Sequence, residues 1–271
     1  MITIARTLPA LLLASSFACD GRSLAPELPA VGSSELALSR RMLPGGPPQP
    51  VGSFPATVYG ASFVRVMKDG TIYYGKPTAV FTRHLDPDAL NELLAAWAPE
   101  SLGVLASSYD LNSRWCAEQG ISPCGVVGNP TTEVYRLEGV AMREVMVMNG
   151  TVDELAAWDG LVPAKLLAAA RTLEGIASGG ERWRASAFLL QAEVDTFASS
   201  ARDWPVRSLS LAAIASATPT LAETLTVDAA PIVAELHELF SNEEVPFATF
   251  REAGKTYMVG LCPILPGAIV R

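Results

Sequence analysis

One stretch predicts the fold most directly: TVYGASFVRVMKDGTIYYG, residues 57–75. Two runs rich in Val, Tyr and Phe stand on either side of Asp69-Gly70. Asp-Gly between such runs indicates a β-hairpin with a type I′ turn, because that turn needs positive φ at both central positions. Residues 78–85 predict a third strand. This part of the chain is therefore expected to form an antiparallel meander.

The hydrophobic period then changes from that of a strand to that of a helix. Asp86 suits an N-cap, and Pro87 suits the first helical turn. Four apolar residues follow at helical spacing, and Pro99 ends the pattern. We expect this helix to lie on the sheet through Leu90, Leu93, Leu94 and Trp97.

The remaining chain repeats the alternation of strands and helices. Strands are predicted at 131–137, 140–148, 183–194 and 224–227, and a hairpin turns at Ala253-Gly254. Helices are predicted at 151–158 and 163–176, and from a cap at Asp228 to Phe240. Residues 110–130 are expected to form a long loop. The fold class is therefore α+β: antiparallel sheets with helices packed on one face, in two sub-units that meet near Gly179.

The N-terminus has the order of a bacterial secretory signal. Arg6 supplies a positive charge, residues 8–14 form a short apolar core, and Ser16-Phe17-Ala18 precedes Cys19. The apolar core is shorter than the roughly 20 residues that a membrane-spanning helix needs. Three interpretations fit: a lipoprotein acylated on Cys19, cleavage after Ala18 to release a soluble protein, or a buried N-terminal helix. The cysteine at this position favours the lipoprotein.

Composition divides the chain into four segments. A signal peptide at 1–18 precedes a lipid-anchored tether at 19–55, where Pro and Gly are too frequent for regular structure, apart from an optional short helix at 34–42. An α+β domain follows at 56–178, and a smaller α+β unit at 181–271. The formal net charge is −8, and the chain lacks the basic footprint of a nucleic-acid-binding protein.

The cysteines beyond Cys19 suggest one disulfide. Cys116 and Cys124 lie close together in the predicted loop, while Cys262 stands apart. In an oxidising compartment, Cys116 and Cys124 are expected to form a bridge. A metal site is the alternative, but the spacing is not C-x-x-C and no His lies nearby. Arg114 and Trp115 precede Cys116, and both residue types are frequent in binding hot spots. They are the candidate partner-binding residues, with Trp115 packed into the core as the alternative.

Several short motifs occur in a fixed order along the chain: Asp69-Gly70-Thr71, Tyr74, Gly75, Tyr109, Asn129-Pro130-Thr131-Thr132, Ala253-Gly254-Lys255-Thr256-Tyr257 and Pro263-x-Leu265-Pro266-Gly267. With these motifs the chain resembles a family of secreted bacterial proteins and lipoproteins that has no established activity. Similar chains carry a Gly-Thr-x-x-Tyr hairpin, a helix and a Pro-Thr-Thr strand in this order. The resemblance covers residues 57–176 and, more weakly, 204–267. It implies a fold and a location in the envelope, but no reaction.

No motif for catalysis stands out. His84 and His237 are the only histidines, and neither lies in an H-E-x-x-H or nucleophile-elbow pattern. Both are expected to be structural or on the surface. No cofactor or metal is predicted. The favoured function is a non-catalytic envelope lipoprotein that binds a protein or envelope partner. The alternative is a secreted or periplasmic hydrolase with an unrecognised acidic site.

Overall fold

A large mixed sheet forms the first part of the computed structural model, which describes residues 36–43, 62–122, 131–138, 143–149, 159–196, 200–219, 223–241 and 247–266. Neighbouring strands are antiparallel except for the parallel pair β5 and β7. The strand order is β5 (Ser108–Asp110), β7 (Arg143–Met148), β6 (Thr132–Leu137), β1 (Leu36–Leu43), β2 (Ser62–Met67), β3 (Thr71–Lys76), β4 (Ala79–His84) and β8 (Glu181–Arg182).

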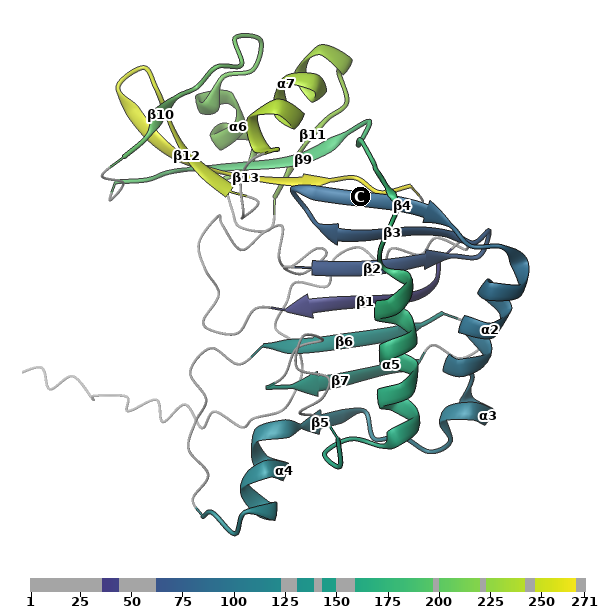
Figure 1. Ribbon diagram of the computed structural model, residues 1–271. Helices are drawn as coiled ribbons and strands as arrows, with labels where there is room; N and C mark the ends of the chain where they lie inside the picture. Colours follow the sequence, from purple (N-terminus) through teal and green to yellow (C-terminus); the bar gives the residue numbers. More distant parts are fainter. Residues whose placement is uncertain are drawn as a thin grey trace, which may run out of the picture.

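Helices α2 (Pro87–Trp97), α3 (Pro99–Leu102) and α5 (Ala164–Ile176) cover one face of this sheet (Figure 1). The predicted cap is confirmed, because the Asp86 carboxylate accepts a hydrogen bond from the Ala89 amide at 2.8 Å. Leu93 and Trp97 of α2 are buried in the same core as Leu166 and Leu173 of α5. Apolar burial between helices and sheet therefore holds this part together.

The second sheet is smaller and carries its own helices. Helices α6 (Leu211–Ala217) and α7 (Ala230–Phe240) pack on one of its faces around Phe188, Leu236 and Phe250. In Figure 1 this unit lies beyond the β4 side of the large sheet. Its strand order is β10 (Arg202–Asp203), β12 (Phe247–Glu252), β13 (Lys255–Pro263), β9 (Phe188–Val194) and β11 (Leu225–Val227).

A third apolar cluster joins the two sheets. Leu189 and Cys262 point from the small sheet away from its helices, and they pack with Phe63 and Tyr73 of the large sheet. Cys262 is a free thiol, and its complete burial raises its pKa well above the usual range. The architecture is α+β, as predicted. None of the helices within the described residues has the length and apolar character to cross a membrane.

Strand β1 lies inside the range 19–55 predicted as a tether. The optional helix predicted at 34–42 is wrong, because residues 36–43 form this strand. It is central in the large sheet, paired with β2 on one side and β6 on the other. Leu38 and Arg40 on its helix-facing side are buried. The sequence does not predict this eight-residue strand, because Pro- and Gly-rich residues surround it and its partner strands are distant in sequence.

Three further local predictions differ from the structure. Gly70 has φ +90° and its amide donates to the Met67 carbonyl, so the first hairpin turns through a type I turn followed by a left-handed glycine. The type I′ prediction is therefore wrong there. Helix α7 begins without a side-chain cap, so Asp228 does not cap it. Residues 111–118 of the predicted loop form helix α4 (Leu111–Glu118). The helix predicted at 151–158 lies outside the described residues.

Candidate functional site

The predicted site residues Arg114 and Trp115 lie on α4, at the β5 end of the large sheet (Figure 1). Asp110 caps the helix and accepts hydrogen bonds from the backbone amides of Asn112 and Ser113. The helix ends in a Schellman motif: Gly120 has φ +67°, and the Ile121 amide donates to the Cys116 carbonyl at 2.8 Å. A two-turn helix is therefore fixed at both ends.

Asp110 also ties α4 to the sheet. It stands at the carboxyl end of β5, and Asn149, directly after the parallel strand β7, donates its side-chain amide to the Asp110 carboxylate. Burial opposes ionisation of Asp110, but hydrogen bonds from Ser113 and Asn149 outweigh it and lower the pKa of the carboxyl. The cap is therefore a stable carboxylate anchored to two strands.

Arg114 is engaged within the molecule. Its Nη1 donates to the Leu161 carbonyl at 2.7 Å, and its guanidinium lies over the Tyr109 ring, 4.7 Å from the centroid. The Tyr109 hydroxyl accepts in turn from the Ala106 amide. Arg114 therefore holds α4 against the β5 strand and the turn at Leu161. This role makes it a positioning residue for the surface beside it.

Trp115 is on the surface. Trp115 is 49% exposed, so the alternative prediction, in which Trp115 is packed into the core, is wrong. Ile121 is 44% exposed, and the Schellman turn brings it back over the last turn of α4. We call Trp115 and Ile121 the α4 tip. Ile121 is a part of this surface that sequence reasoning missed, because the predicted loop hid the helix that orients it.

The two remaining predicted sites fall wholly or partly outside the described residues. Cys116 is buried on the inner side of α4, whereas Cys124 is not among the described residues. Their disulfide stays a prediction. Cys19 lies outside the described residues as well, so lipidation also stays a prediction.

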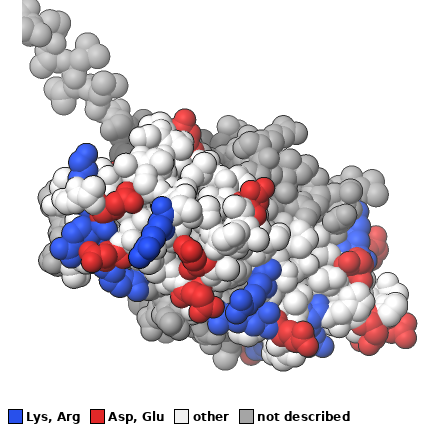
Figure 2. Space-filling model, turned by 90° about the horizontal axis from the view of Figure 1, so that it is seen from above, with Lys and Arg blue, Asp and Glu red and all other residues white. Residues whose placement is uncertain are grey.

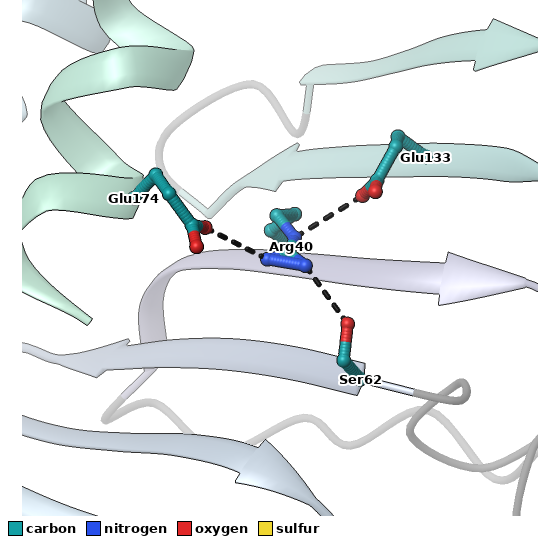
Figure 3. A network of polar contacts seen from close by, with 4 residues as sticks. All are labelled: Arg40, Ser62, Glu133 and Glu174. Atoms are coloured by element: carbon teal, nitrogen blue, oxygen red, sulfur yellow. Dashed lines mark hydrogen bonds and ion pairs between the residues drawn. The ribbon is translucent and has the colours of Figure 1, made fainter. Parts of the chain in front are cut away.

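A polar cluster surrounds the buried Arg40 on the helix-facing side of the large sheet (Figure 3). Its Nε forms an ion pair with Glu133 at 3.1 Å, without hydrogen-bond geometry, and its Nη1 reaches Glu174 of α5 at 3.2 Å. Its Nη2 donates to the Ser62 hydroxyl at 2.9 Å. Three strands and one helix therefore meet at one guanidinium.

Two aromatic polar atoms lie in the same core. The Tyr135 hydroxyl and the Trp97 Nε1 have no hydrogen-bond partner among the described residues, and their rings stack at 5.1 Å between centroids. Burial and the charge of Glu133 raise the pKa of Tyr135, so this group stays protonated. Glu133 is completely buried, whereas Glu174 is 42% exposed. Both carboxylates thus pair with Arg40, and only Glu174 is exposed to solvent.

Charge does not mark a site on the face seen from above. Figure 2 shows Lys and Arg interspersed with Asp and Glu over the coloured residues of that face. Among the described residues, no group of three or more His, Cys, Asp or Glu side chains is placed to hold a metal ion. The α4 tip is therefore the best-defined candidate surface.

Comparisons with known proteins give no relative for this chain. No family model, no curated protein and no solved structure matches it. The chemistry of the α4 tip thus has to be judged from its own geometry.

Proposed function

We propose that this protein is a non-catalytic lipoprotein of the bacterial cell envelope that binds a protein partner through the α4 tip. The observation that carries the binding role is Trp115, an exposed indole on a helix fixed at both ends. Rigid aromatic side chains supply much contact area at low entropic cost and are enriched in binding hot spots. The lipid anchor rests on the signal sequence and Cys19. It would hold the protein at a membrane surface.

Crosslinking in intact cells tests the binding role. We expect Trp115→Ala to lose the crosslinked partner while its melting temperature stays close to that of the wild type, because the side chain is half exposed. Val104→Ala is the matched control, because Val104 is a fully exposed apolar residue outside α4. If Trp115→Ala keeps its partner, or if both variants lose it equally, the α4 tip is not the binding surface.

Acyl labelling tests the anchor independently. A Cys19→Ser variant should lose incorporated fatty acid, because it lacks the thiol that carries the acyl chains. It should then no longer partition into detergent, because acyl chains provide the anchor. Ser16→Leu is the control, since it changes the signal without removing the acylated thiol. Absence of label and detergent partitioning in the wild type would favour the alternative, a soluble secreted protein.

The proposed disulfide would close the chain after α4. Mass spectrometry under non-reducing conditions should find the Cys116 and Cys124 peptides linked. A bridge over about nine residues would stabilise the protein by roughly 2.5 kcal/mol in the chain-entropy model. Two free thiols in the oxidised protein would contradict the bridge.

The alternative function is a hydrolase with an acidic site. The Arg40 cluster supplies two carboxylates paired with one guanidinium, Glu133 and Glu174, of which Glu174 is partly exposed. A hydrolase of this kind would lose its activity in a Glu174→Gln variant. The binding role instead expects this variant to keep the crosslinked partner.

A further inference from the structure

The segment that joins the two sheets is attached firmly to the large sheet. Arg182 donates from Nη2 to the Thr78 carbonyl at 3.3 Å, and the Trp183 amide donates to the Val80 carbonyl at 2.9 Å. The Trp183 ring meets Tyr73 edge to face, with 5.4 Å between centroids. Residues 182 and 183 therefore follow the large sheet.

The same segment is attached to the small unit through His237, in addition to the surface ion pair of Arg184 with Glu238 and the buried side chain of Ala185. His237 of α7 lies with Nε2 3.1 Å from the Ala185 carbonyl, and its ring meets Phe188 edge to face at 4.8 Å. A carbonyl oxygen only accepts, so the hydrogen bond requires a proton on Nε2. In the neutral ring Nδ1 then carries no proton.

A small cavity adjoins this contact. Thr78, Arg182, Trp183 and His237 line it together with apolar residues of α7, β9 and β13, and it has room for about one water molecule. His237 is partly buried beside this cavity, so a charge on its ring would lose part of its hydration. Loss of hydration destabilises a charged group.

The charges near His237 favour its neutral form. Arg182 and Arg184 approach from the joining segment, and Glu238 of α7 is the acidic neighbour, shared with Arg184 at 3.8 Å. The cavity-lining residues of the 77–78 turn, β9 and β13 carry no charge. Burial lowers the pKa of His237 below its ordinary value, and both arginines act in the same direction against the Ala185 hydrogen bond and Glu238.

We propose that His237 is a pH-sensitive latch between α7 and the segment that joins the two sheets. The neutral ring closes the latch, and protonation on Nδ1 places a third positive charge beside Arg182 and Arg184 and opens it. Because the unfolded chain binds this proton more readily than the folded one, stability is full above a pH of about 6.5 and falls as the pH drops below it. This inference does not depend on the proposed function.

The chain has two histidines, so a substitution of His84 is a matched control for a substitution of His237. His237→Gln keeps an N–H donor near the position of Nε2 but cannot be protonated, and His84→Gln removes the exposed histidine at the end of β4. We expect the wild type and His84→Gln to lose melting temperature between pH 7 and pH 5, and His237→Gln to lose clearly less. Amide exchange should show protection factors in α7 that fall severalfold over this range, while those in α2 stay constant.

Titration of the two imidazoles by NMR in the wild type tests the latch even if His237→Gln folds poorly. The His237 resonance should titrate below the ordinary histidine value, together with the α7 amides. A His237 resonance that titrates at or above that value, or α7 amides whose protection ignores the pH, would overturn the latch. An equal pH dependence of melting in the wild type and His237→Gln would overturn it as well.

Discussion

Single buried charges set the tightest constraints on this fold. Arg40 lies on the central strand β1, and its guanidinium forms an ion pair with the completely buried Glu133. A carboxylate without its counter-ion in such a place is strongly destabilised. The sequence shows Arg40 next to Arg41 in a Pro- and Gly-rich stretch, and nothing local indicates which of the two is buried. This information resides in the pairing of β1 with β6.

Replacing Arg40 should therefore be costly. Arg40→Met keeps much of the side-chain volume but removes the buried ion pair with Glu133, and we expect the free energy of unfolding to fall by about 3–5 kcal/mol. Denaturant titration measures this loss. Arg251→Met is the control, because Arg251 pairs with Asp203 on the surface at 3.8 Å and solvent screens such pairs. Equal small effects in both variants would contradict the role of Arg40.

At the scale of elements, prediction succeeds where the signal is local. The capped helix α2 and the hairpin at Ala253-Gly254, where both residues have positive φ, follow from their own residues. Strand β1 and helix α4 do not. β1 is stabilised by pairing with β2 and β6, which lie far from it along the chain. α4 depends on Asn149 and Leu161, which reach Asp110 and Arg114 only in the folded molecule. The candidate surface was predictable as far as Trp115, but not Ile121.

Alanine substitutions at Gly70 and Gly175 should change stability in opposite directions, because Gly70 lies in a turn with positive φ and Gly175 lies in a helix. Gly70 has φ +90°, and a Cβ there would lie 2.7 Å from the Leu85 carbonyl oxygen, so Gly70→Ala should lower stability by more than about 1 kcal/mol. Gly175 lies in α5, where a Cβ meets nothing within 4 Å. Gly175→Ala should instead raise stability by about 0.5–1 kcal/mol. Thermal melts of both variants test this, and changes of the same sign would refute it.

At the scale of the whole molecule, the two sheets share an apolar boundary. Each sheet has a helix-covered core of its own, and the third cluster around Phe63 and Leu189 lies between the sheets. Sequence patterns locate the two units, because Gly179 and Gly180 interrupt the chain between them. They do not reveal the shared cluster. β2 and β9 carry apolar residues on both faces, with Phe63 beside Val64 and Leu189 beside Leu190, but such a run does not say which element covers the second face.

The shared cluster should make the two sheets unfold together. We expect calorimetry of the wild type to give one transition, with the calorimetric and van't Hoff enthalpies equal. Phe63→Ala removes a buried ring from the boundary and should cost about 3–5 kcal/mol. It should also split or broaden the transition, because each sheet keeps its own core. Leu236→Ala, in the core between α7 and the small sheet, is the control. It should lower stability by about 2–5 kcal/mol without weakening the Phe63 contacts. Two separate transitions already present in the wild type would mean that the boundary contributes little to cooperativity.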